Sequence, residues 1–214
     1  MIKILHTTFL ENKFYGISFF AWLLVGGLLL FLNEKGDLIL FFNDHRSYSG
    51  DLFFRYATKL GEEITYLLIL IFFLIYRRKA AWLIPVSGVL VLLISKGLKE
   101  FFKQDRPIAW FKKQDLFEVL NLIDGVPLLH GASSFPSGHT MSAFALFGLL
   151  ALLVPQKKGI GILILGLAIL VGFSRVYLIH HFFLDIYVGS ILGTLLALII
   201  YTLWVRVQPE ELRA

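Results

Sequence analysis

Four polar residues that could do chemistry stand close together between two long apolar runs: Arg175, His180, His181 and Asp185. If the chain is helical from His181 onward, His181 and Asp185 share one face. The carboxylate can then accept a hydrogen bond from one imidazole nitrogen and leave the other free. An imidazole oriented in this way can act as a nucleophile or a base. His180 points about 100° away around such a helix and has no carboxylate at that spacing, so His181 is the favoured candidate.

Further polar residues precede this stretch. Lys99 comes shortly before Arg106, and Pro136-Ser137-Gly138-His139 has the composition of a turn that enters an apolar helix. Cations beside imidazoles, with no cluster of carboxylates to hold a hard metal, suit a metal-free site for a phosphate ester. Arg106 and Arg175 could grip phosphoryl oxygens bidentately, and Lys99 would supply a point charge. The N–H groups at the helix N-terminus would hold the same anion.

The composition indicates an integral membrane protein. The chain has 214 residues, of which 57% are hydrophobic and 16% charged, and its mean hydropathy of +0.77 is too high for a soluble domain. Its net charge of +5 could suggest nucleic acid. The basic residues, however, form short clusters between apolar runs, where they are typical of topology signals and headgroup contacts, so we expect no nucleic-acid partner. The absence of cysteine excludes disulfides, thiolate metal sites and cysteine nucleophiles.

Six apolar segments predict an all-α polytopic membrane protein, with six transmembrane helices in a bundle and one domain over residues 1–214. The first segment is long enough to cross a hydrocarbon core of ~30 Å, and no small-residue cleavage site follows it, so we expect it to be retained. The second is short and must extend back through Glu62 and Glu63. The predicted spans are Phe14 to Leu32, Ile64 to Tyr76, Ala80 to about Leu98, about Ser137 to Val154, Gly159 to about Arg175, and Ile186 to Val205.

The distribution of positive charge predicts the orientation. The connections Arg77-Arg78-Lys79 and Gln156-Lys157-Lys158 are basic, and Lys3 and Lys13 precede the first span. The positive-inside rule therefore places them and both termini in the cytoplasm. The candidate site then faces the periplasmic, extracytoplasmic side of a cell (inner) membrane. The outward loop between Lys99 and Ser137 is itself basic, which opposes the rule and invites a functional explanation.

Polar residues outside this set have simpler interpretations. The segment from Gly36 to Gly61 mixes phenylalanines with charges, which fits either a segment lying in the headgroup layer or an ordinary connecting loop. His45 and His130 are interpreted as solvated loop histidines. Glu62 and Glu63 are interpreted as a cap at the membrane interface.

Three parts of the sequence together resemble the signature of the type 2 phosphatidic acid phosphatase (PAP2) superfamily, in its bacterial membrane lipid phosphatase branch. Every signature position in this sequence carries the residue that the family pattern has there. The resemblance covers Lys99 to Asp185 by motif and the whole chain by the six-span layout. The three parts are Lys99, six residues, Arg106-Pro107; Pro136-Ser137-Gly138-His139; and Ser174-Arg175, five residues, His181, three residues, Asp185.

The resemblance implies a metal-independent phosphohydrolase without a cofactor. In it, His181 attacks phosphorus to give a phosphohistidine, Asp185 orients His181, and His139 protonates the leaving oxygen. The phosphate-binding residues that it implies are Lys99, Arg106, Ser137, Gly138 and Arg175. The expected substrate is a phosphate monoester or diphosphate of a membrane lipid, of the undecaprenyl diphosphate or phosphatidylglycerophosphate type, because a compact six-span chain resembles those members. A lipid A phosphate or phosphatidate is the alternative.

Two other functions share parts of this pattern. Vanadate-dependent haloperoxidases have the same signature, with His181 as the ligand of the metal oxyanion, but those enzymes are soluble. A lipid-binding or flipping protein without chemistry would bind a phosphate lipid and release no inorganic phosphate. A phosphate-release assay separates this last possibility from a phosphatase.

Overall fold

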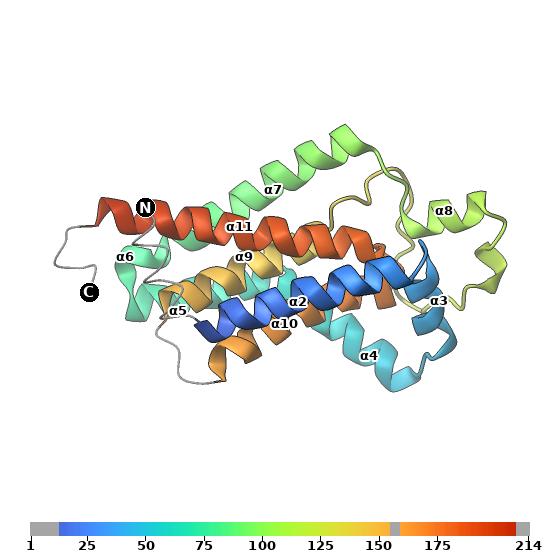
Figure 1. Ribbon diagram of the computed structural model, residues 1–214, viewed down its shortest axis with the longest axis horizontal. Coiled ribbons are helices and arrows are strands. Elements are labelled where there is room, and N and C mark those ends of the chain that lie inside the picture. Colours follow the sequence, from blue (N-terminus) through green and yellow to red (C-terminus); the bar gives the residue numbers. More distant parts are fainter. Residues whose placement is uncertain (1–12, 155–158, 209–214) are drawn as a thin grey trace.

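The computed structural model describes residues 13–154 and 159–208, and all regular structure within them is helical, as predicted. The apolar helices are joined by shorter ones at the ends of the bundle (Figure 1). In chain order the helices are α2 (Lys13–Leu32), α3 (Asp37–Asp44), α4 (Tyr48–Ala57), η1 (Thr58–Gly61), α5 (Glu63–Tyr76), α6 (Arg78–Ala81), α7 (Leu83–Phe102), α8 (Pro107–Lys113), η2 (Phe117–Val119), α9 (Gly138–Leu153), α10 (Ile160–Tyr177) and α11 (Phe183–Val207).

Each predicted span corresponds to a helix. Within the described ranges, α2, α10, α11 and the segment Arg78–Lys113 that contains α7 are long and apolar enough to cross a membrane. Helices α5 and α9 are apolar but shorter, with 14 and 16 residues. The predicted boundaries are a few residues off, since α7 continues to Phe102 and α11 begins already at Phe183. The basic connection at Gln156 to Lys158, and Lys3, lie outside the described residues.

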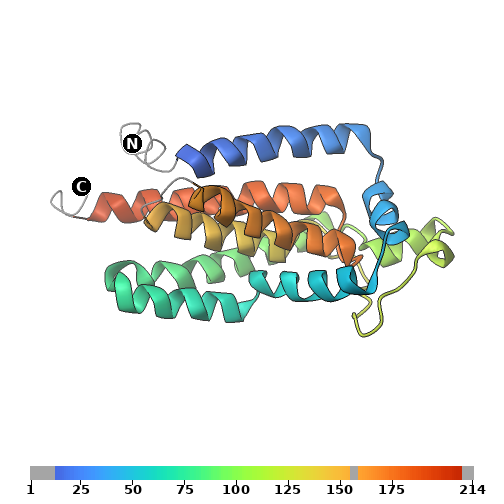
Figure 2. The same ribbon diagram turned by 90° about the horizontal axis from the view of Figure 1, so that it is seen from below.

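Helix α9 is the centre of the bundle. It packs against α11, α10 and α7, and most of its residues are buried, including Phe144 and Leu146. A helix that is apolar on every side is expected in such a position. Figure 2 shows α2 on one side of the layer formed by α9, α10 and α11, with α5 and α7 on the other. The N-terminal end of α9, which carries the Ser137-Gly138-His139 motif, is therefore surrounded by other helices.

Glycines allow α11 to approach α9 closely. A Cβ atom on Gly189 would lie 2.9 Å from the carbonyl oxygen of Ser137, and one on Gly193 would collide with the carbonyl oxygen of Met141. Small residues four positions apart are a common means of bringing two membrane helices into backbone contact. This contact places the first turn of α11, with Asp185, beside the start of α9.

Helix α2 lies at the periphery, and few of its residues are buried. Trp22 fixes it to α11 because the indole N–H donates a hydrogen bond of 2.9 Å to Oγ of Ser190. The segment after α2 forms the short helices α3 and α4, which pack against α10. The stretch from Gly36 to Gly61 is therefore largely helical rather than an irregular loop, and its position in the headgroup layer stays a prediction.

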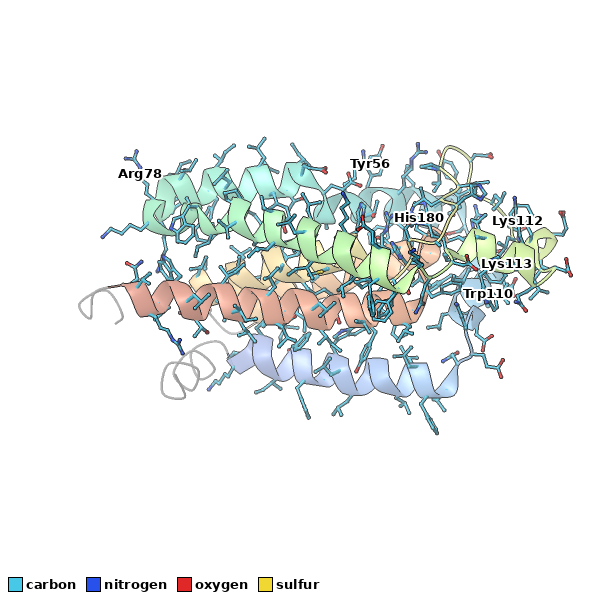
Figure 3. All side chains as sticks on the ribbon, turned by 90° about the horizontal axis from the view of Figure 1, so that it is seen from above. Tyr56, Arg78, Trp110, Lys112, Lys113 and His180 are labelled. Carbon is cyan, nitrogen blue, oxygen red and sulfur yellow. The ribbon has the colours of Figure 1, made fainter. Side chains whose placement is uncertain are left out.

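The two ends of the bundle differ. Arg78, in the α5–α7 connection, lies at one end, whereas His180 lies toward the end that carries Trp110, Lys112 and Lys113 (Figure 3). Helix α7 is inclined to its neighbours and diverges from them toward this second end (Figure 1). The candidate site residues of the α10–α11 turn are thus remote from the basic α5–α7 connection.

Candidate active site

The turn between α10 and α11 brings His181 and Asp185 together. Nδ1 of His181 lies 3.2 Å from Oδ2 of Asp185, which confirms the predicted contact. The helical geometry assumed for it is wrong, because α11 begins at Phe183 and His181 precedes it. Asp185 turns its carboxylate back toward the helix start, where it also accepts a 3.0 Å hydrogen bond from the N–H of Phe182. An acidic side chain in the first helical turn satisfies backbone donors in this way.

Ser134 is a member of the site that the sequence interpretation missed. Its hydroxyl donates to Oδ2 of Asp185 at 2.5 Å and lies 3.5 Å from Nδ1 of His181. Ser134, His181 and Asp185 are all buried. Because Asp185 occupies Nδ1 of His181, the Nε2 atom is the nitrogen left for reaction.

The surroundings of the His181 imidazole favour its neutral form. Burial lowers the pKa of His181 well below its ordinary value, and the nearby positive charges of Arg175 and Arg106 lower it further. A neutral imidazole has a lone pair at Nε2, and only this form can attack an electrophile.

His180 faces away from this pair. Its Nε2 atom lies 3.1 Å from the carbonyl oxygen of Pro127, and burial lowers its pKa to about 3. Its own carbonyl oxygen accepts a 3.1 Å hydrogen bond from Nη1 of Arg106. His180 is therefore a neutral, structurally engaged imidazole, and no carboxylate is bonded to its ring in the described part of the chain.

Arg106 is fixed where α8 begins. Its Nε donates to Oγ of Ser133 at 3.1 Å, and its backbone N–H donates to the carbonyl of Gly131 at 2.9 Å. Pro107 follows as the first residue of α8, where its missing N–H is tolerated. Together with the bond to His180, these contacts hold the guanidinium plane in one orientation beside the α10–α11 turn.

Arg175 is almost fully buried in the last turn of α10, with 4% of its surface exposed. Its Nη1 donates to Oγ1 of Thr58 at 2.7 Å, but its Nε is buried without a hydrogen-bond partner. Within residues 13–154 and 159–208, neither Arg175 nor Arg106 nor Lys99 forms an ion pair. Buried positive charge without a counter-ion is costly. The arrangement therefore favours an anionic ligand.

The start of α9 supplies further donors. Gly138 and His139 are its first two residues, so their N–H groups have no intrahelical acceptor. A Cβ on Gly138 would lie 3.6 Å from Nζ of Lys99, which places the ammonium beside this helix end. The N–H of Ser137 donates instead to the main-chain carbonyl of Asp185 at 3.1 Å. We expected the N–H groups of the turn to be free to bind an anion. For Ser137 this expectation is wrong, because its N–H is already bonded to Asp185.

The hydroxyl of Ser137 is buried and accepts a 2.9 Å hydrogen bond from Oγ1 of Thr140. Its own proton remains to be donated. Ser137 can thus contribute to an anion site through this proton alone, in addition to fixing the turn through its main chain.

A groove of about 430 Å³ reaches this helix end. Its polar lining includes Lys99, His139 and Glu62, and its apolar part lies between α5 and α7. Nε2 of His139 lies 3.5 Å from Oε1 of Glu62. The sequence interpretation treated Glu62 only as an interface cap and missed this contact. The structure brings all eight predicted residues to one end of α7, α9, α10 and α11.

No group of three histidine, aspartate or glutamate side chains in the described ranges is arranged to hold a metal ion. The metal-free character of the site stays a prediction.

Comparison with known proteins identifies the class. The chain matches the model of the PAP2 superfamily over residues 80–209. The chain belongs to the PAP2 superfamily.

Two curated relatives carry phosphatase names. The chain is 36% identical over 126 residues to phosphatidylglycerophosphatase B of Bacillus subtilis (strain 168), which covers 51% of the chain and 54% of the relative. It is 28% identical over 141 residues to undecaprenyl-diphosphatase of Sulfolobus acidocaldarius. That alignment covers 65% of the chain and 63% of the relative. The alignments thus span between half and two thirds of these relatives.

Two solved structures have the same fold over more of their length. LpxE of Aquifex aeolicus matches with a TM-score of 0.66 and 30% identity over 78% of this chain and 94% of that one. The PAP2-type phosphatidylglycerolphosphate phosphatase of Bacillus subtilis matches with a TM-score of 0.62 and 25% identity. The match covers 91% of this chain and 98% of that one. The membrane character of the chain is consistent with its own apolar helices.

Proposed function

We propose that the protein is a metal-independent membrane lipid phosphatase that works through a phosphohistidine on His181. The observation that carries the proposal is the convergence of three cations, Lys99, Arg106 and Arg175, on the neutral imidazole that Asp185 orients. None of the three forms an ion pair within residues 13–154 and 159–208. A phosphoryl group supplies the negative charge that these cations lack. The phosphatase names of two relatives support the same reaction class.

The first step would be attack of Nε2 of His181 on phosphorus. The P–N bond forms as the bond between phosphorus and the leaving oxygen breaks, and His139 donates a proton to that oxygen. Asp185 stabilises the positive charge that develops on His181. Arg106, Arg175 and Lys99, with the N–H groups of Gly138 and His139, would stabilise the negative charge on the other phosphoryl oxygens.

The second step would release phosphate. His139, now neutral, accepts a proton from a water molecule as the water oxygen attacks phosphorus and the P–N bond breaks. His181 returns to its neutral form and His139 to its charged form. In this proposal the same cations stabilise the phosphoryl group in both steps and take the place of a metal ion.

The groove between α5 and α7 supports a lipid as substrate. Its wall includes Tyr66, Val91 and Leu92, and it reaches Lys99 and His139. An amphiphile could keep its tail along the apolar part and bring its phosphate to the cations. We propose an undecaprenyl diphosphate or phosphatidylglycerophosphate type of substrate, with a lipid A phosphate or phosphatidate as the alternative.

We further propose that the apolar helices α2, α5, α7, α9, α10 and α11 form six spans of a single domain in the cell (inner) membrane. The basic residues around Arg78 would then lie in the cytoplasm with both termini, and the His180 end would face the extracytoplasmic side. The separation of these two ends in Figure 3 supports this arrangement.

The purified protein in detergent tests the function. Inorganic phosphate should be released from at least one lipid phosphate or diphosphate of the proposed classes, in the presence of a metal chelator. Rapid acid-free quenching should trap phosphate on His181. Binding of these lipids without release of phosphate would show a lipid-binding or flipping protein instead.

A further inference from the structure

Glu62 and His139 face each other in the groove between α5 and α7. The two side chains belong to segments far apart in the chain, yet Oε1 of Glu62 lies 3.5 Å from Nε2 of His139. This is an ion-pair distance if His139 is protonated. About a third of each side chain is exposed, so the pair lies at the groove surface rather than in the core.

The backbone holds Glu62 in this place. The carbonyl of Gly61 accepts a 2.9 Å hydrogen bond from Oγ of Ser142 in α9. A Cβ on Gly61 would lie 3.0 Å from the carbonyl oxygen of His139 and 2.8 Å from a methyl group of Val171. The junction of η1 and α5 is therefore packed directly onto the helix turn that carries His139. This packing fixes the backbone of Glu62 beside the turn that carries His139.

Among the residues that the structure describes, the other groups around His139 offer it no further carboxylate at ion-pair distance. Arg175 of α10, Lys99 of α7, and the imidazoles His180 and His181 of the α10–α11 turn act on it electrostatically, and all of them are cationic or neutral. Glu63 and Tyr66 of α5 line the same groove, but neither forms an ion pair with His139 within the described residues. Positive neighbours favour the neutral imidazole, whereas a carboxylate at this distance favours the imidazolium.

We propose that Glu62 is a positioning residue that orients His139 and favours its protonated form, so that His139 can donate a proton to the leaving oxygen. This inference rests on the proposed phosphatase function. Glu62 touches neither phosphorus nor the leaving oxygen, and acts only through His139. It does for His139 what Asp185 does for His181, but from another part of the chain.

The substitution Glu62→Gln tests the inference, because it keeps the shape of the side chain and removes its charge. Its matched control is Glu63→Gln, which removes the neighbouring, exposed carboxylate. For a lipid phosphate, Glu62→Gln should lower kcat/KM roughly tenfold, part of the ~10²-fold or more expected of a general acid. The basic limb of its pH profile should move to lower pH. Glu63→Gln should leave the basic limb of the pH profile unchanged, because Glu63 forms no ion pair with His139 in the described part of the chain.

Leaving-group dependence separates an acid–base role from a structural one. Nitrophenyl phosphate releases a phenolate that is stable without a proton, so Glu62→Gln should cost less activity with it than with an alkyl phosphate. In the His139→Ala background, Glu62→Gln should have no further effect, since the two residues act as a unit.

Three results would overturn the inference in an active enzyme: an unshifted basic limb, an equal loss with both leaving groups, or additive losses in the double variant. A wild-type protein that releases no phosphate from any substrate would instead overturn the proposed function, and the inference with it.

Discussion

Asp185 accepts a hydrogen bond from His181 although the helix that carries Asp185 begins two residues after His181. The contact depends on the turn rather than on a shared helical face. The N–H groups of His180 and His181 both donate to the carbonyl of Arg175, at 2.9 and 3.1 Å, and this ends α10. Ile179 has a positive φ of 57° in the same turn. The chain thereby reverses direction and returns His181 to the carboxylate of Asp185.

Ser134→Ala should lower activity although this serine lies outside the three signature parts of the sequence. Its hydroxyl is one of three donors to Oδ2 of Asp185, and removal of one leaves the carboxylate freer to rotate away from His181. We expect kcat/KM to fall about tenfold, because the lost bond to a charged group is worth about 1.5 kcal/mol. Thermal unfolding in detergent should change little. Unchanged kinetics in a folded variant would show that Phe182 and His181 fix Asp185 on their own.

Arg106→Lys should be damaging although the charge is kept. A planar fork that presents parallel donors is replaced by a point charge that cannot bond Ser133, His180 and a phosphoryl oxygen together. We expect a loss of ~10²-fold or more in kcat/KM, on the scale of other oxyanion donors. Near-normal turnover would mean that Arg106 only positions the segment around Ser133.

The pH dependence of kcat/KM should be bell-shaped, since His181 must be neutral and His139 charged. Burial lowers the pKa of His181. The neutral nucleophile therefore persists as pH falls, and is lost only when pH passes through this lowered value. The acidic limb should consequently lie below the ordinary histidine pKa of about 6.5. An acidic limb at or above that value, measured with a substrate already fully ionised there, would contradict the buried neutral state.

The orientation can be checked with single cysteines, because the natural chain has none. Lys112 and Arg78 lie at opposite ends of the bundle (Figure 3). In intact cells, an impermeant maleimide should label Lys112→Cys and spare Arg78→Cys, while both should react after the membrane is opened. The reverse pattern would place the site in the cytoplasm.

The helices were predictable because long apolar runs have few alternatives in a membrane. The ends of the helices were less predictable, because they depend on individual main-chain hydrogen bonds. The α10 terminus, for example, depends on the two N–H groups that bond Arg175. The charged motif residues and the histidines were predictable because each stands out in an apolar chain, whereas Ser137 and Gly138 were assigned through the resemblance to the PAP2 signature. Asp185 and His181 are near neighbours in sequence, so even a wrong helical assumption led to the right pair.

Ser134 and Glu62 were missed because their contacts are distant in sequence. Ser134 and Asp185 are 51 positions apart, and no periodicity relates them. Glu62 next to Glu63 at a helix start has the ordinary composition of a helix end. Only the packing of Gly61 against α9 brings one of the two glutamates to His139.

The adjacent histidines give the most direct test of the central claim. His181 is bonded to Asp185, and His180 to the carbonyl of Pro127, so one dipeptide contains the nucleophile and its control. The measurement is inorganic phosphate release from a lipid phosphate by purified His181→Ala and His180→Ala, each shown to be folded. The account predicts that His181→Ala releases none and that His180→Ala keeps most of the wild-type rate. An active His181→Ala beside an inactive His180→Ala would contradict it.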